Sequence, residues 1–344
     1  MPANQKTMLP VAAAVLCTAI FGFKALGTAA AKAQYITLDI NGDGAVPGSI
    51  NAKGFVAGRY AANGFVRSPS GKITTFNIDG AINYFVEAIN NNREVAGFYA
   101  PAGGPNHGFV RTSNGTITTF DPSGSVGTSV WGINGSGTAT GGWFDSNFNQ
   151  HGFLRTAKGR IVSFDVAGAA GTEGYSISTS GVVAGTSVTS NNIVRGFVRA
   201  ADGTLTGFDC AAGAVDTYGL SINDAGTIAG YCIVNGGFHG YIRAADASIT
   251  TFDPPDSHGY TFAWGINNLG AVTGYYDDDT GKSHGFLRTP SGKFKEFEVP
   301  KGPGGFPHGP SGAPHGTFPV SINDSGTIVG TYTSGGTLGF LRIP

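Results

Sequence analysis

The sequence has few charged residues, and their signs balance. Of its 344 residues, 21 are Lys or Arg and 22 are Asp or Glu, which leaves a formal net charge of −1. A surface that binds nucleic acid or an anionic membrane is usually strongly basic, because it must neutralise phosphate groups. The composition therefore indicates no nucleic-acid partner, and it favours a polar ligand without net charge.

Cysteine is also scarce, with three residues in the chain. Cys17 lies in the apolar run of residues 8–23, which follows Lys6 and precedes Ala31-Lys32-Ala33. A short apolar run before an A-x-A site is typical of a secretory signal, and this run is shorter than the ~20 residues that span a bilayer. We therefore expect residues 1–33 to be a cleaved signal peptide. Residues 34–344 would then be a secreted or periplasmic protein without membrane insertion.

The other two cysteines are Cys210 and Cys232. Two cysteines in an oxidising compartment usually pair, whereas a structural zinc site needs four ligands. The sequence therefore predicts a disulfide between them.

Glycine is abundant, with 57 residues, and it penalises helix interiors. In place of a helical pattern the chain has an internal repeat of about 44 residues. Its clearest segment is Gly-Phe-x-Arg, with Tyr replacing Phe once. The arginines of this segment are Arg67, Arg111, Arg155, Arg199, Arg243, Arg288 and Arg342.

Three further segments recur with it, and all four are rich in β-formers and bounded by turn residues. An Ile-Asn segment, a Val-Ala-Gly segment, the Gly-Phe-x-Arg segment and a Thr-Thr-Phe-Asp segment follow one another in every repeat. We interpret them as the first, second, third and fourth strands of an antiparallel unit. Four strands in about 44 residues indicate a blade of a β-propeller; the coils of a β-helix, the alternative, are much shorter.

The two ends of the repeat region complement each other. The chain has a lone fourth strand at residues 36–39, and it ends after a first, second and third strand at residues 320–342. Together these segments make one complete unit, and their pairing would leave no open edge. The sequence therefore predicts an all-β domain over residues 34–344: a seven-bladed β-propeller whose N-terminal strand joins the last blade and closes the ring.

The sequences of the repeated segments resemble those of the bacterial HAF-type extracellular repeat proteins. The resemblance lies in the segments His-Gly-Phe-Leu-Arg at 151–155 and 284–288, Ile-Asn-Asn-Leu-Gly at 266–270 and Thr-Thr-Phe-Asp at 118–121. This chain has Gly where the family name implies Ala. The resemblance implies export and a repeat fold, and it supplies no reaction and no catalytic residues.

Recurring polar residues have a structural interpretation. A histidine before the third strand is followed, fourteen residues later, by an acid that ends the fourth strand. Neighbouring antiparallel strands bring such residues together, so we expect hydrogen-bonded pairs rather than metal sites. The repeated arginines are expected to be solvated or paired at the turn between the third and fourth strands. The predicted pairs are His107 with Asp121, His151 with Asp165, His239 with Asp253 and His284 with Glu298, with Arg195 and Asp209 as a substitute.

The variable loops identify the face on which a site is expected. Loops between the second and third strands, and between one repeat and the next, differ in length and composition, whereas the other turns are uniform. Ligands usually bind to variable loops on a rigid scaffold. The Gly/Pro-rich insertion at 300–319 would lie on this face as a mobile loop or a lid. The candidate ligand-binding residues are Glu87, Trp131, Trp143, Asp145, Tyr175, Asp256, His258, Tyr260, Trp264 and Asp277.

One segment follows the pattern of a calcium loop. Asp39, Asn41 and Asp43 alternate before Gly44, as in D-x-N-x-D-G, but an EF-hand would have an acid where Ile50 stands. The segment is therefore a calcium candidate or an ordinary turn. No other cofactor is indicated.

Three functions remain open at this stage. The first is a monomeric, non-catalytic secreted module that binds an extracellular glycan, small molecule or protein. The second is a carbohydrate-active enzyme. A glycoside hydrolase would need two carboxyls ~5–5.5 Å or ~6.5–9.5 Å apart, and a polysaccharide lyase would use His258 with Tyr260. The third is a structural role. The candidate carboxyls are Glu87, Glu173, Asp145, Asp256 and Asp277.

Overall fold

Short runs of β-branched and aromatic residues between Gly, Asn and Ser turns fold here as strands. The computed structural model describes residues 32–300, 316–333 and 336–344, and these form twenty-eight β-strands and no helix. The predicted signal peptide, and most of the insertion at 300–319, lie outside the described residues. None of the described residues belongs to a helix long and apolar enough to cross a membrane.

The strands fall into groups of four along the chain, within the unit Ala33–Pro344. The first three groups are β2 (Val46–Ile50), β3 (Val56–Tyr60), β4 (Asn63–Arg67), β5 (Ile73–Phe76); β6 (Ala81–Ile89), β7 (Val95–Pro101), β8 (His107–Arg111), β9 (Ile117–Phe120); and β10 (Gly127–Ile133), β11 (Ala139–Phe144), β12 (Gln150–Arg155), β13 (Ile161–Phe164). The next three are β14 (Ala169–Ile177), β15 (Val183–Thr189), β16 (Val194–Arg199), β17 (Leu205–Phe208); β18 (Asp216–Ile222), β19 (Ile228–Val234), β20 (Gly237–Arg243), β21 (Ile249–Phe252); and β22 (Thr261–Ile266), β23 (Val272–Asp277), β24 (Ser283–Arg288), β25 (Phe294–Phe297). The remaining strands are β26 (Thr317–Ile322), β27 (Ile328–Thr333), β28 (Thr337–Ile343) and, from the start of the domain, β1 (Gln34–Leu38).

Each group is an antiparallel meander, as the sequence predicts. A single parallel bridge between Gln150 and Gly171 links the third group to the fourth, so that these eight strands count as one sheet. β1 pairs with β28 in antiparallel register, from Gln34 opposite Ile343 to Leu38 opposite Gly339. The first and last strands of the described domain therefore belong to one four-stranded sheet.

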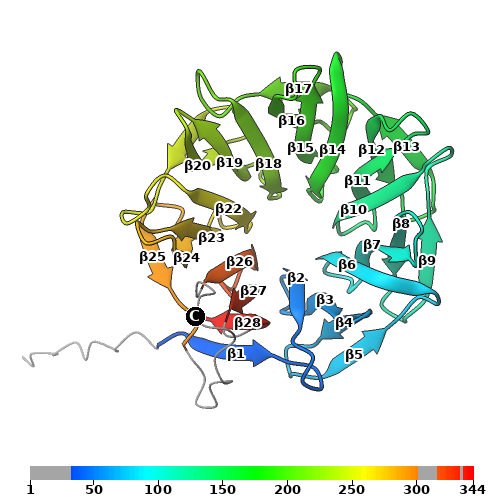
Figure 1. Cartoon of the computed structure of the whole chain (residues 1–344), viewed down its shortest axis with the longest axis horizontal. Coiled ribbons are helices and arrows are strands. Elements are labelled where there is room, and N and C mark those ends of the chain that lie inside the picture. The colour runs from blue at the N-terminus through cyan, green and yellow to red at the C-terminus, as the bar shows by residue number, and fades with distance from the viewer. Residues whose placement is uncertain (1–31, 301–315, 334–335) are drawn as a thin grey trace, which may run out of the picture. The chain divides into compact units, whose positions relative to one another are not determined.

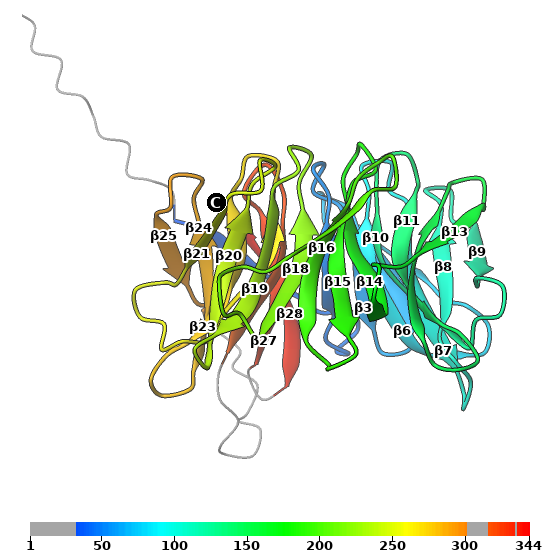
Figure 2. The same cartoon turned by 90° about the horizontal axis from the view of Figure 1, so that it is seen from above.

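The first strand of every group lies innermost (Figure 1). Each innermost strand contacts the innermost strand of the next group, from β2 and β6 through to β22 and β26, and β26 also contacts β2. Seen from above, the strands of all groups cross the same layer and their loops lie at its two faces (Figure 2).

The core lies between neighbouring groups, where the aromatic residue of each third strand is buried. Phe65 is 1% exposed, and its counterparts are completely buried. These six counterparts meet the aromatic residue of the preceding fourth strand edge to face, as Phe76 meets Phe109 with ring centroids 6.0 Å apart. The completely buried counterparts are Phe109, Phe153, Phe197, Tyr241, Phe286 and Phe340.

The repeated arginines are paired, which is one of the two possibilities that the sequence left open, and five of the seven are buried. The guanidinium of Arg155 lies 4.6 Å from the ring centroid of Phe120 in the neighbouring group, and Nη1 donates to the carbonyl of the next residue. A guanidinium over an aromatic face gains a cation–π attraction that is stronger when water is excluded. The Gly-Phe-x-Arg segment thus joins one group to the next. The same contact, at 4.8–5.2 Å, is made by Arg111, Arg199, Arg243, Arg288 and Arg342.

The Ile-Asn segments have a role that sequence reasoning missed. The buried Asn51 donates from Nδ2 to the carbonyl of Asn90, which donates in turn to the carbonyl of Asn134. The series continues across the groups and returns to its start, where Asn323 donates to the carbonyl of Asn51 at 3.2 Å. Ser178 replaces Asn in one group, and its hydroxyl pairs locally with Ser180 instead. The other donors are Asn134, Asn223 and Asn267.

The predicted histidine–acid pairs form within the groups. The distance from histidine Nδ1 to the carboxylate oxygen is 2.7–3.0 Å in all four pairs, and Arg195 pairs with Asp209. These contacts confirm the structural interpretation of the repeated histidines. His284 also contacts Asp278 through Nε2 at 2.8 Å, so both of its ring nitrogens are engaged.

Candidate functional site

Every innermost strand has a β-bulge that adds one residue to its pairing with the second strand. A bulge re-aims the side chain of the extra residue, and here all the extra residues line one pocket of about 470 Å³. We call it the central pocket. The extra residues are Gly48, Glu87, Trp131, Tyr175, Leu220, Trp264 and Val320.

Aromatic pairs across the first two strands support this wall. Two residues before the bulge, Phe85 stacks on Phe98 with centroids 4.5 Å apart, and Tyr218 stacks on Tyr231 at 4.6 Å. Such cross-strand pairs stabilise a sheet and hold the rings in place. Phe85, Tyr218 and Tyr231 line the central pocket beside the bulge residues. The pocket therefore presents large aromatic surfaces on a rigid frame.

A buried carboxylate holds two of the rings. Trp131 donates from Nε1 to Glu173 Oε1 at 2.6 Å, and the Tyr175 hydroxyl donates to Glu173 Oε2 at 3.2 Å. Glu173 fits because the facing residue is Gly142, where a Cβ would lie 2.8 Å from Oε1. Burial raises the pKa of Glu173, and the hydrogen bond from Trp131 opposes that rise. Glu173 thus positions the aromatic wall.

Glu87 is the acidic residue that lines the central pocket. Burial raises its pKa to about 7, and the positive charge of Arg59, which lines the same pocket, acts in the opposite direction. The carboxylate lies deep in the protein and keeps part of its surface on the pocket. Within the described residues, no hydrogen bond or ion pair satisfies it. A carboxylate desolvated in this way is costly unless a ligand supplies a partner.

The phenols beside the pocket are neutral donors. Burial raises the pKa of Tyr175, of Tyr231 and, to about 12, of Tyr275, with nearby negative charge adding to the effect for Tyr175 and Tyr275. They remain protonated over the whole physiological range. The pocket therefore combines aromatic faces, hydroxyl donors and the opposite charges of Glu87 and Arg59.

The structure separates the candidate residues that lie between the fifth and sixth groups and on β22. Asp256 and His258 line a second, open pocket with Tyr276, Asp278 and Glu296, whereas Trp264 lines the central pocket. This corrects the expectation that these side chains gather around one mouth. The chain passes from the outer edge to the innermost strand between them, so proximity in sequence does not become proximity in space.

Other candidates also lie outside the central pocket. Tyr260 stacks on Phe238 with centroids 5.6 Å apart, and Trp143 stacks on His151 at 4.6 Å while its indole donates to a serine hydroxyl. Asp145 accepts hydrogen bonds from its own turn, including one from the Asn149 side chain that lowers its pKa.

Asp277 and Asp39, the first residue of the calcium candidate, each make a local hydrogen bond. Asp277 accepts a hydrogen bond from the Ser283 hydroxyl at 2.6 Å. Asp39 accepts one from the Gly42 amide at 3.0 Å, which is the geometry of a tight turn. No group of three or more His, Cys, Asp or Glu residues in the described part of the chain is arranged to hold a metal ion.

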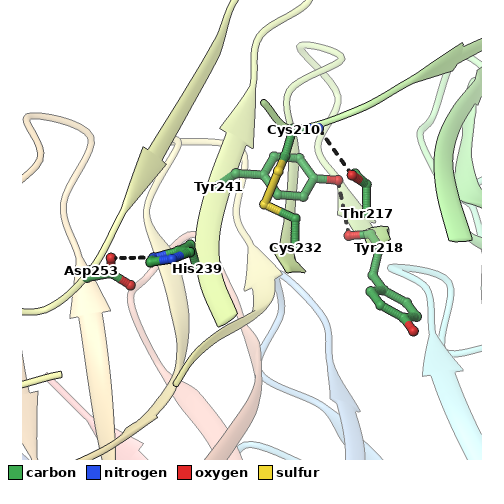
Figure 3. The surroundings of a disulfide bond; sticks show 7 residues. All are labelled: Cys210, Thr217, Tyr218, Cys232, His239, Tyr241 and Asp253. Carbon is green, nitrogen blue, oxygen red and sulfur yellow. Dashed lines mark hydrogen bonds and ion pairs between the residues drawn. A yellow bond between two sulfur atoms is a disulfide. The ribbon is translucent and has the colours of Figure 1, made fainter. Parts of the chain in front are cut away.

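Cys210 and Cys232 form a disulfide that ties the loop before β18 to β19 (Figure 3). The same region is held by the Cys210 amide, which donates to Thr217, and by the Tyr241 hydroxyl, which donates to the carbonyl of Tyr218. The disulfide therefore fixes the strand that carries Tyr218 and Leu220 into the central pocket.

Sequence reasoning missed several residues of the central pocket, among them Arg59, Tyr218, Leu220 and Tyr231. Their signal was present in the repeat. Aligning the Ile-Asn segments places the bulge residue two positions before each isoleucine, and reading that column through all repeats gives the complete inner ring. Arg59 and Tyr231 occupy one equivalent position on the second strand, directly after Gly58 and Gly230, where they pair with the residue two positions before the bulge.

Comparison with known proteins identifies the fold of this chain. No family model matches the chain, and no curated protein matches it in sequence. Among solved structures it is similar to a catalytically inactive virginiamycin B lyase from Staphylococcus aureus crystallised with quinupristin, with a TM-score of 0.61 and 15% identity over 91% of this chain and 100% of that one. A streptogramin B lyase has a TM-score of 0.59 and 14% identity over 91% and 98%.

A structure from a study of two prolyl endopeptidases has a TM-score of 0.61 and 11% identity, and the match covers 88% of this chain and 50% of that one. Together with the four-stranded antiparallel sheets, these likenesses show that the chain has the β-propeller fold. At such low sequence identities, the shared fold does not imply that this chain has the activity of any of these proteins.

Proposed function

We propose that the four-stranded groups form a closed propeller of seven blades, with β1 completing the last one. The pairing of β1 with β28 supports this, as does the contact between β26 and β2. The hydrogen bond from Asn323 to Asn51 joins the last group to the first in the same way as the other groups are joined. Closure matters for function because Val320 and Gly48, on opposite sides of the junction, line the same pocket.

We propose further that the protein is a non-catalytic binding module whose central pocket holds a small polar ligand without net charge. One observation carries the proposal: the extra residue of every innermost strand faces a single cavity, and these residues are not repeated from group to group. A scaffold needs the bulge in every repeat, but it has no need for Trp, Tyr and Glu at that position. Sites for small molecules are typically concave, rich in aromatic surface and supplied with a few polar groups.

The aromatic walls suit a ligand with a flat or ring-shaped apolar face. Trp131 and Tyr175 lie with centroids 5.5 Å apart at an angle of 41°, and Trp264 is 37% exposed. A sugar ring or a small organic molecule stacks on such surfaces while its polar groups reach the phenols. An extracellular glycan end or a small metabolite therefore fits the pocket better than a large protein surface does.

The enzymatic alternative has less support. Glu87 is the carboxylate that lines the central pocket among the described residues, and Glu173 is engaged by Trp131 and Tyr175. The two-carboxyl arrangement of a glycoside hydrolase is therefore not supported there. His258 and Tyr260 do not share a pocket, which removes the support for a lyase.

Export remains part of the proposal. A disulfide forms and persists in oxidising compartments, so the bond between Cys210 and Cys232 agrees with a periplasmic or extracellular location. We propose accordingly that residues 1–33 direct export and that the mature chain belongs with the HAF-type extracellular proteins.

A binding screen tests the function. Residues 34–344 are screened against glycans and small metabolites, and products are sought for every compound that binds. We expect binding without turnover, and we expect Trp131→Ala or Trp264→Ala to weaken it at least tenfold. Trp143→Ala is the matched control, since Trp143 lies outside the central pocket, and it should leave binding unchanged. Binding that depends on Trp143 and not on the other two tryptophans would refute the choice of site.

A further inference from the structure

The two charged side chains of the central pocket have opposite signs and do not pair with each other. Glu87 comes from the bulge of β6, and Arg59 comes from β3, where it lies opposite Val46. The described residues show no ion pair or hydrogen bond between them. Arg59 nevertheless acts on Glu87 by Coulombic attraction, so the two charges are separated but close enough to interact across the pocket.

A ring contact holds Arg59 without neutralising it, and close backbone packing fixes the strand that carries Glu87. The guanidinium carbon of Arg59 lies 5.5 Å from the ring centroid of Phe85, which covers one face of the group, and its N–H groups make no hydrogen bond to another residue in the described part of the chain. Gly48 keeps the backbone of β2 close to that of β6, since a Cβ there would lie 2.0 Å from the carbonyl oxygen of Val86. These close contacts keep the strands that carry the two charges at a fixed spacing.

Burial of the unpaired Glu87 carboxylate carries a cost that a suitable ligand removes, and Arg59 offers an opposite charge in the same pocket. Buried charges are expensive unless they are paired, and a charge-assisted hydrogen bond to each repays part of that cost. A ligand with a single charge would satisfy one group and oppose the other. A ligand with both charges satisfies the two together and still has no net charge.

We propose that the central pocket binds a small zwitterion, with its ammonium group at Glu87 and its anionic group at Arg59. This inference rests on the proposed function, because it names the ligand class of the same pocket. The carboxylate of an α-amino acid matches the fork of a guanidinium, and its ammonium group is attracted both to Glu87 and to the faces of Trp131 and Tyr175. A cavity of about 470 Å³ has room for such a molecule and its side chain.

Four probes with the same branched side chain separate the two charges. Isothermal titration calorimetry on residues 34–344 compares L-leucine, which carries both charges, with L-leucinamide, N-acetyl-L-leucine and 4-methylpentanamide. The second has only the ammonium group, the third only the carboxylate, and the fourth neither. We expect leucine to bind at least tenfold more tightly than each of the others. Equal binding of leucine and either singly charged probe would overturn the inference, and this comparison needs no variant.

Two variants then assign each charge to its residue. In Glu87→Gln, leucine should lose its advantage over N-acetyl-leucine; in Arg59→Gln, it should lose its advantage over leucinamide. Arg93→Gln is the matched control, since the Arg93 guanidinium also lies over a phenylalanine ring, at 5.6 Å, but outside the central pocket. Thermal unfolding checks that each variant is folded. An unchanged order of affinities in both pocket variants would overturn the assignment.

The results distinguish failure of this inference from failure of the proposed function. If neutral sugars or metabolites bind in a manner that depends on Trp131 while leucine does not, the pocket is a ligand site and the zwitterion is wrong. If no compound of either set binds in a manner that depends on Trp131, both proposals are wrong.

Discussion

The charge state of Glu87 offers a quantitative test of the pocket. The substitution Glu87→Gln keeps the shape of the side chain and removes its negative charge. Burial raises the pKa of this carboxyl from 4.5 to about 7, which means that the folded protein holds a proton that the unfolded chain has already released. Between these two values the native state binds more protons, so raising the pH destabilises it.

The size of the effect follows from the same values. A rise from 4.5 to about 7 corresponds to about 3 kcal/mol at most, and contact of the carboxylate with the open pocket reduces this to about 2 kcal/mol. Below pH 4.5 both states are protonated and the cost is absent. Above pH 7 the cost is complete. Glu87→Gln should therefore match the wild type in stability at pH 4 and exceed it by about 2 kcal/mol at pH 8.

Guanidinium chloride unfolding at pH values from 4 to 8, with the disulfide intact, measures this difference. Glu298→Gln is a control of opposite sign: the hydrogen bond and charge of Lys282, with His284, hold the pKa of Glu298 below its usual range. Its substitution should reduce stability near neutral pH, and the reduction should disappear in acid. A difference between wild type and Glu87→Gln that is constant with pH would refute the burial of an unpaired carboxylate.

Two other predictions concern the contacts that stabilise the fold. Replacing Cys210 and Cys232 together by Ser should lower the free energy of unfolding by about 3 kcal/mol, because the disulfide closes a loop with a sequence separation of 22. Urea unfolding of oxidised protein measures this, and an unchanged midpoint would contradict it. Asn323→Ala should cost about 1–3 kcal/mol, since it removes the donor that joins Asn323 to the carbonyl of Asn51 and leaves the buried amide of Thr327 without its acceptor. The same substitution at the exposed Asn114 should cost less than 0.5 kcal/mol.

Much of the fold could be predicted because each repeat carries its own turn and strand signals. The Ile-Asn and Thr-Thr-Phe-Asp segments set the strand order, and the histidine–acid spacing correctly placed the ends of the third and fourth strands beside each other. The aromatic partners of the arginines could not be named from the sequence, because a residue's neighbours in the adjacent group do not show in its own repeat. The cation–π contact of Arg155 is with Phe120, which lies 35 positions earlier in the chain, and only packing between groups brings the two side chains together.

The site was predicted only in part, for a related reason. Glu87, Trp131, Tyr175 and Trp264 stand out because they break a repeated position, and the structure brings them to one pocket. Arg59 contributes to the same pocket from the second strand, and it stands out only when that position is compared through all repeats. The loops with Asp256 and His258 looked functional because they vary, yet they lie at a separate pocket. Which loop residues meet depends on the register of strands rather than on composition.

The indole signals of the three tryptophans test the central claim most directly. In a ¹⁵N-labelled sample of residues 34–344, each indole gives one NMR signal, assigned by replacing one tryptophan at a time with phenylalanine. When a compound that binds in the screen is added, the signals of Trp131 and Trp264 should shift together with one affinity, while that of Trp143 stays in place. A bound ligand that shifts Trp143 alone, or none of the three, would contradict the assignment of the central pocket as the binding site.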